Sequence, residues 1–135
     1  MFVAAEGTNA DFTDAVMERV RLNDAQMHRG IFRYARLPDA NLSGANLSGG
    51  DLSMADLRGN LNEVNLSQAD LRGADLTGAN LTGANLRLAN MFDAKLADAK
   101  LSRIHMDGAI GPHGQRVGNR AAGKKPARPW WQFWG

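Results

Sequence analysis

Side chains capable of catalysis are present, but their spacing does not favour it. No two of the three histidines, His28, His105 and His113, stand at a spacing typical of a metal site or a proton relay. The chain has no cysteine, which excludes disulfides, thiolate metal sites and a cysteine nucleophile. A serine nucleophile needs a base beside it, and none accompanies Ser43, Ser48, Ser53 and Ser67. We therefore expect no enzyme activity, no bound metal and no cofactor.

Aspartates are the most regularly placed ionisable residues. Two carboxylates act as acid and base when different environments separate their pKa values. Here four aspartates recur in nearly one sequence context, each followed by leucine, so their surroundings should be alike. They are better candidates for an interaction surface than for a catalytic pair, and the four that concern us are Asp51, Asp56, Asp70 and Asp75.

These aspartates belong to a repeat of five residues that runs through most of the chain. One stretch reads ANLSG, ANLSG, GDLSM, ADLRG, and a later one reads ADLRG, ADLTG, ANLTG, ANLRL. An apolar residue marks the centre of every unit from Phe12 to Met106, and a small residue, mostly alanine, stands two positions earlier. The frame slips once, because Leu57 is followed by Leu61 instead of an apolar residue at position 62.

The spacing predicts a coil that turns a corner at every fifth residue. Apolar positions spaced by 2 and 3 in rotation fit neither a helix nor a simple alternating strand. If four units close one coil of 20 residues, Phe12 stacks on Phe32, and every other centre likewise stacks on the equivalent centre of the next coil. The slip is then a shortened corner between Leu57 and Leu61.

The motif A-(D/N)-L-x-x resembles the pentapeptide-repeat family over residues 10–108. The resemblance implies an all-β fold, a right-handed quadrilateral β-helix, here of about five coils. We expect an N-terminal cap at residues 1–9, the β-helix at 10–108 and a C-terminal tail at 109–135.

The resemblance also implies an alternative function for the aspartates. Family members that bind topoisomerases and confer quinolone resistance are understood as mimics of the DNA duplex. Asp51 and Asp70 on one side, with Asp56 and Asp75 on the next, would form such an acidic face of this protein. Arguments against it are the arginines of the same two sides and a charge of only 11 − 14 = −3 over residues 1–110. The simpler expectation is that these residues serve turns and solvation.

Several apolar residues fall at outward positions of the repeat. Leu88 and Phe92 lie near the C-terminal end of the predicted coil, and Met106 is the last centre. An exposed apolar patch often marks an interface. We therefore predict that Leu88, Phe92 and Met106 form a docking patch for the tail or for another molecule.

The tail combines basic charge with aromatic residues. Its five basic residues stand without an acidic one, and its end reads PARPWWQFWG, with Trp130, Trp131, Phe133 and Trp134 as candidate protein-binding residues. The segment could cap the last coil or join two copies into a homodimer through their C-terminal ends, a pairing that family members show. It could instead bind a groove of another protein or an anionic membrane surface. Direct binding of nucleic acid is not expected, because so few charges would bind it weakly.

Taken together, the sequence predicts a non-enzymatic, rigid scaffold for protein–protein interaction that docks through its tail. The length of 135 residues suits one domain. No apolar run approaches the roughly 20 residues needed to cross a bilayer, and residues 1–10 lack the pattern of a secretory signal. We accordingly expect a cytoplasmic protein, with a topoisomerase as the alternative partner.

Overall fold

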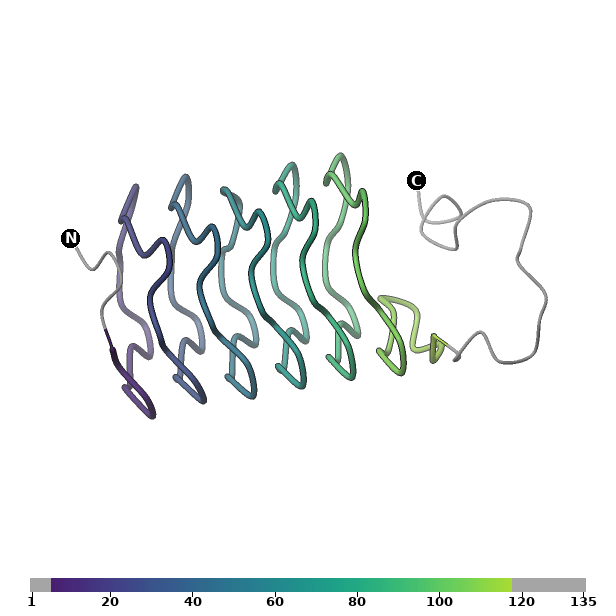
Figure 1. Ribbon diagram of the computed structural model, residues 1–135, viewed down its shortest axis with the longest axis horizontal. Helices are drawn as coiled ribbons and strands as arrows, with labels where there is room; N and C mark the ends of the chain where they lie inside the picture. The colour runs from purple at the N-terminus through teal and green to yellow at the C-terminus, as the bar shows by residue number, and fades with distance from the viewer. Residues whose placement is uncertain (1–5, 118–135) are drawn as a thin grey trace.

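In the computed structural model, which describes residues 6–117, the chain winds into a stack of similar coils along one long axis (Figure 1). Positions one coil apart lie side by side: Asp11 pairs with Ile31, and Ile31 pairs with Asp51, always in parallel. The fold is a right-handed quadrilateral β-helix, as predicted. Within residues 6–117 there is no helix, and every strand is reduced to a single bridging residue.

The outward bridging residues form four columns that define the sides of the coil. Side A carries Asp11, Ile31, Asp51, Asp70, Asn90 and Ile110. Side B carries Val16, Arg36, Asp56, Asp75 and Lys95. Side C carries Arg21, Asn41, Asn60, Asn80 and Lys100. Side D carries Glu6, Gln26, Asn46, Asn65, Asn85 and His105.

Backbone hydrogen bonds explain the period of five. The amide of Phe32 donates to the carbonyl of Asp51 in the next coil at 2.7 Å, and the amide of Tyr34 donates to that of Ser53 at 3.1 Å. Between them the chain turns, because the amide of Ala35 donates to the carbonyl of Phe32 at 3.0 Å and Tyr34 has a φ of 58°. A positive φ at the third residue is the geometry of a type II turn. Each unit is thus one short strand and one turn.

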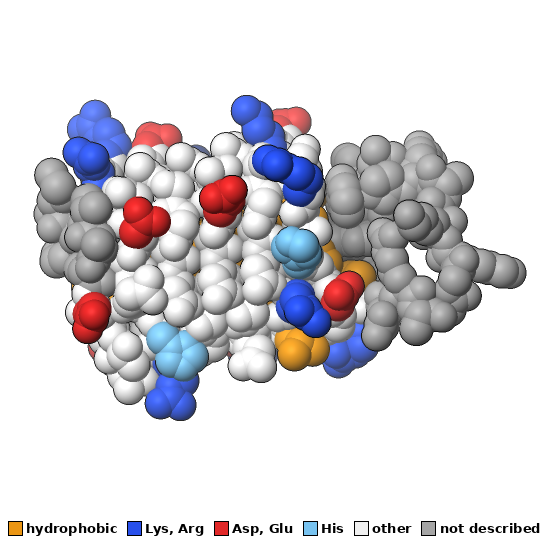
Figure 2. Space-filling model, viewed as in Figure 1, with side chains coloured by type: hydrophobic (Ala, Val, Ile, Leu, Met, Phe, Trp, Pro, Cys, Tyr) orange, Lys and Arg blue, Asp and Glu red, His pale blue; other side chains and the backbone are white. Residues whose placement is uncertain are grey.

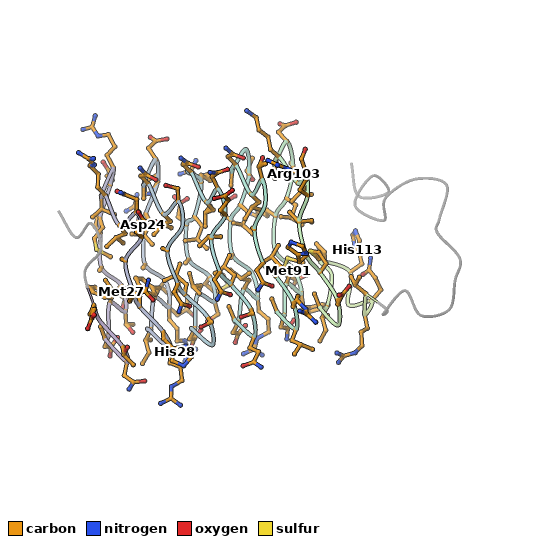
Figure 3. All side chains as sticks on the ribbon, viewed as in Figure 1. Asp24, Met27, His28, Met91, Arg103 and His113 are labelled. Atoms are coloured by element: carbon orange, nitrogen blue, oxygen red, sulfur yellow. The ribbon has the colours of Figure 1, made fainter. Side chains whose placement is uncertain are left out.

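The interior is filled by the predicted centres and the small residues before them. From Leu22 to Met91 every centre is at most 2% exposed. Phe12 and Phe32 stack with ring centroids 5.0 Å apart and planes 17° apart, which confirms the column predicted from their spacing. Towards the two ends of the stack, Phe12, Met17 and Leu96 are only partly buried. In Figure 3 the side chains of two other centres, Met27 and Met91, lie within the coil.

The slip in the repeat is a shortened corner, as predicted. Asn60 pairs with both Asn41 and Asn80, so side C stays in register although one coil is a residue short. The corner closes tightly, because the amide of Gly59 donates to the carbonyl of Leu57 at 2.9 Å. One turn residue is therefore missing from this corner, and a shallow hollow of about 640 Å³ lies there.

Both ends of the coil extend beyond the limits predicted from the repeat. Pairing already begins at Glu6, and Gly7 holds a centre position, with its amide donating to the carbonyl of Gln26 at 2.7 Å. At the other end Ile110 pairs with Asn90, and Arg116 then folds back antiparallel to Ile110. The first residues of the predicted tail thus form a closing turn. No helix within residues 6–117 is long and apolar enough to span a membrane.

Candidate functional site

Most outward asparagine and aspartate side chains are committed to the turns. Asn46 Oδ1 accepts the backbone amide of Ser48 at 3.1 Å, and Asp75 Oδ1 accepts that of Thr77 at 3.0 Å. The same contact, two residues along the chain, recurs on all four sides. Asparagine and aspartate favour such turns because their short side chains reach the backbone two residues on. The repeated asparagine or aspartate therefore serves mainly to hold the turn, and a binding function must come from the other outward groups.

Sides C and D form a largely uncharged surface in the middle of the coil. Their bridging residues there are asparagines, and Figure 2 shows a mostly white face crossed by a few isolated charges. Asp24 and Arg103 mark opposite ends of this face in Figure 3. Because the amide oxygens are used by the turns, the outward groups of these asparagines are hydrogen-bond donors.

The four aspartates of the predicted acidic face are neighbours in adjacent coils. Asp51 pairs with Asp70 on side A, and Asp56 pairs with Asp75 on side B. Arginines lie against all of them: the separations are 3.5 Å for Arg33–Asp51, 2.6 Å for Arg58–Asp56, 3.8 Å for Arg58–Asp75 and 2.7 Å for Arg72–Asp70. The structure thus brings the carboxylates together but offsets their charge.

Two of these carboxyl groups titrate lower than usual. The side-chain hydrogen bonds of Arg58 lower the pKa of Asp56, against the effect of burial. Burial by itself would raise the pKa of Asp70, but the hydrogen bonds and charge of Arg72 outweigh it and the net pKa is lowered. Both ion pairs therefore favour the folded state above the ordinary titration range of aspartate.

We expect Asp56→Asn to remove part of the acid sensitivity of folding. Asparagine keeps an oxygen for the Arg58 amide but cannot pair with the guanidinium, so the variant should lose about 0.2–1 kcal/mol at neutral pH. A carboxyl group with a lowered folded pKa stabilises above its unfolded pKa and loses that effect as the pH falls through the folded pKa. The deficit should shrink in acid, as urea unfolding at about pH 7 and about pH 2.5 would measure. Asp93→Asn, at a residue with no ion pair in residues 6–117, is the control.

Three large apolar side chains lie along one corner of the coil, where side A turns into side B. Tyr34, Met54 and Phe92 are 51%, 53% and 46% exposed. Met54 lies over Gly73 of the next coil, and Met54, Gly73 and Phe92 together line a hollow of about 240 Å³. We call Tyr34, Met54 and Phe92 the apolar stripe. Tyr34 was not among the outward apolar residues found from the sequence, although its place two residues after the centre Phe32 marks it as a corner residue.

The predicted docking patch is not one surface. Leu88 and Phe92 line separate hollows, at the corners before and after side A, and Met106 is 5% exposed within the core. The difference arises because Leu88 ends one unit and Phe92 follows the centre of the next, so the strand of side A stands between them. The hollow at Leu88 has a volume of about 470 Å³ and includes Val117, the last residue described.

Within the described residues, one histidine contacts a serine across adjacent coils. His28 Nδ1 and Ser48 Oγ are 2.7 Å apart, but Ser48 Oγ donates its hydrogen to Asn46 Oδ1 at 2.7 Å. With its hydrogen directed to Asn46, the Ser48 hydroxyl contacts His28 through its oxygen. No three His, Asp or Glu side chains within residues 6–117 gather where they could hold a metal ion. The candidate residues Trp130, Trp131, Phe133 and Trp134 lie outside the described residues.

Eight copies of the model for pentapeptide repeats match residues 32–59 and 60–96. The chain belongs to the pentapeptide-repeat family. This pentapeptide-repeat protein is 30% identical to HetL, a protein involved in heterocyst differentiation regulation from the cyanobacterium Nostoc sp. strain PCC 7120, over 85% of this chain and 63% of HetL, with a TM-score of 0.45. It is 39% identical to alr5209 of Nostoc PCC 7120, over 58% of this chain and 66% of alr5209, with a TM-score of 0.46.

A third solved structure that resembles this pentapeptide-repeat protein is QnrB1, a plasmid-mediated fluoroquinolone resistance protein. The identity is 22% over 78% of this chain and 62% of the QnrB1 chain, with a TM-score of 0.43. The present chain thus spans less than two thirds of the length of each of these three proteins. No curated protein matches the sequence.

Proposed function

We propose that this pentapeptide-repeat protein is a rigid, non-enzymatic binding protein that contacts another protein through the apolar stripe. The aromatic residues Trp130, Trp131, Phe133 and Trp134 are proposed as a second docking element. The coil supplies rigidity, because each unit is hydrogen-bonded to the coils before and after it. Members of the family are in general structural or binding proteins.

The observation that carries this proposal is the alignment of Tyr34, Met54 and Phe92 on one corner. Folding does not explain them, since most outward corner positions elsewhere, Leu88 excepted, hold glycine or a polar or charged residue and expose no large apolar side chain. Arg33 and Arg72 flank the same hollow, and their side chains are 53% and 59% exposed. A partner surface with apolar side chains bordered by polar groups would match this corner.

A comparison of three baits tests the proposal: the full chain, a Tyr34→Ser/Met54→Ser/Phe92→Ser variant and a shortened chain ending at Gly123. A partner purified after recovery with the full chain should bind it directly and should bind the triple variant at least about tenfold more weakly, since three apolar contacts are lost. Unchanged far-UV circular dichroism would show that the variant is folded. Equal binding of the triple variant would overturn the role of the stripe.

Inhibition of a type II topoisomerase through Asp51, Asp56, Asp70 and Asp75 is the alternative. The register of the two pairs favours it, whereas the arginines beside them oppose it, because a duplex mimic needs uncompensated negative charge. We expect no inhibition in a gyrase supercoiling assay. Inhibition that disappears when the four residues are changed to asparagine would establish the alternative and refute our first choice.

A further inference from the structure

The hollow at Leu88 is built around an apolar side chain whose position folding does not explain. Leu88 is 56% exposed and has a φ of 62°, a left-handed conformation that costs a leucine about 1–2 kcal/mol. Gly108 makes room for it, since a Cβ there would stand 2.6 Å from Leu88 Cδ2. Leu88 therefore lies flat against the next coil and presents its other face to the hollow.

The rim of this hollow suits a flat aromatic ring. Arg116 Nη1 donates to the carbonyl of Gly108 at 2.9 Å, which holds the guanidinium beside the hollow. Arg87 lies 3.9 Å from Asp107 on the same rim. Guanidinium groups stack on aromatic faces, tryptophan being the preferred partner. A volume of about 470 Å³ lies in the range of small-molecule sites, so it has room for an indole.

We infer that this hollow is the seat of the chain's own aromatic segment, residues 126–135, and that an indole of the segment packs between Leu88, Val117 and the two arginines. The described chain ends at Val117, which itself lines the hollow. Residues 118–129 can reach about 40 Å when extended, far more than a return to the adjacent hollow requires. Tethering also gives the segment an effective concentration on the order of millimolar.

This inference concerns the tail alone and is independent of the stripe. It assigns one of the three indoles to the coil itself and leaves the other aromatic residues of the tail for a partner protein. The hollow at Phe92, which also has a large exposed apolar side chain in its lining, is about half as large, and the larger hollow at the shortened corner has none. A seated segment would cover the exposed face of Leu88.

Tryptophan fluorescence tests the inference directly, because all three tryptophans of the chain lie in residues 130–134. The full-length protein should emit at shorter wavelength than a peptide of residues 118–135, and acrylamide should quench it about 1.5-fold less, if one of three indoles loses most of its exposure. Leu88→Ser should make the emission resemble that of the peptide. Met54→Ser, at a residue of similar exposure on another corner, should leave it unchanged.

Several results would overturn the inference. One is emission of the full-length protein that already equals that of the peptide. Another is a response to Phe92→Ser in place of Leu88→Ser, which would move the seat to the other hollow. A blue shift that grows with protein concentration would identify a second copy as the occupant. Far-UV circular dichroism of each variant confirms that the coil is intact, so that loss of the seat is distinguished from unfolding.

Discussion

Replacing Leu71 with alanine is expected to lower the free energy of unfolding by about 2–5 kcal/mol, the range for large-to-small changes at buried leucines. Leu71 is fully buried and belongs to the column of centres that also holds Leu52 and Met91. The backbone on both sides of the cavity is fixed by hydrogen bonds to adjacent coils, so the site cannot collapse to fill it. Urea unfolding followed by far-UV circular dichroism would measure the loss.

A matched change at an outward position gives the control. Val16→Ala removes apolar atoms from a side chain that is 60% exposed, so its effect should stay within about 0.5 kcal/mol. The contrast between the two variants tests the inward and outward assignment of the repeat. Equal, small effects at Leu71 and Val16 would show that the centres do not form the interior.

Gly59→Ala should destabilise the protein by about 3 kcal/mol, at the upper end of the cost of overpacking. A Cβ at this position would stand 2.5 Å from the carbonyl oxygen and 2.9 Å from the nitrogen of Ala40. Both atoms belong to the backbone of the preceding coil, which cannot move without breaking its pairing. The shortened corner thus depends on the absence of a side chain, and thermal unfolding would show the lower midpoint.

The control for this prediction is Gly78→Asn. Gly78 has a φ of 68° and no atom within 4 Å of where a Cβ would stand. Asparagine tolerates the left-handed conformation better than other residues, so the change should be nearly neutral. A stable Gly59→Ala protein would mean that the corner between Leu57 and Leu61 is more open than the structure shows.

The architecture was predictable because the inward positions can be recognised from their residue types. Leucine at the centre and alanine two positions earlier repeat often enough to give the columns, the stacking of Phe12 on Phe32 and the shortened corner. The unit centred on Gly7 was not predicted, because a glycine at a centre position has no apolar side chain by which the repeat could be recognised. The start of the coil therefore lies earlier than the pattern indicated.

The candidate surfaces were harder to predict, since the outward side chains other than the repeated asparagines and aspartates follow no period. The arginines could be assigned to the sides of the aspartates, but their pairing depends on side-chain conformation, as in the contact between Arg58 and Asp56. Likewise Leu88 and Phe92 are close in sequence, yet the strand between them sends them to different corners. The exposure of Tyr34 could have been predicted, because the repeat places this residue at a corner.

Because the coils stack in parallel at a regular spacing, the length of the molecule is set by the number of its coils. Each coil touches only the coil before it and the coil after it, so duplication of a 20-residue stretch that does not include the shortened corner would add one complete layer without disturbing the rest. The separation between a corner residue of one layer and its counterpart farther along would grow by about 4.8 Å per layer. Evolution, or a protein engineer, could thereby adjust the reach between two contact points in fixed steps while leaving each contact unchanged.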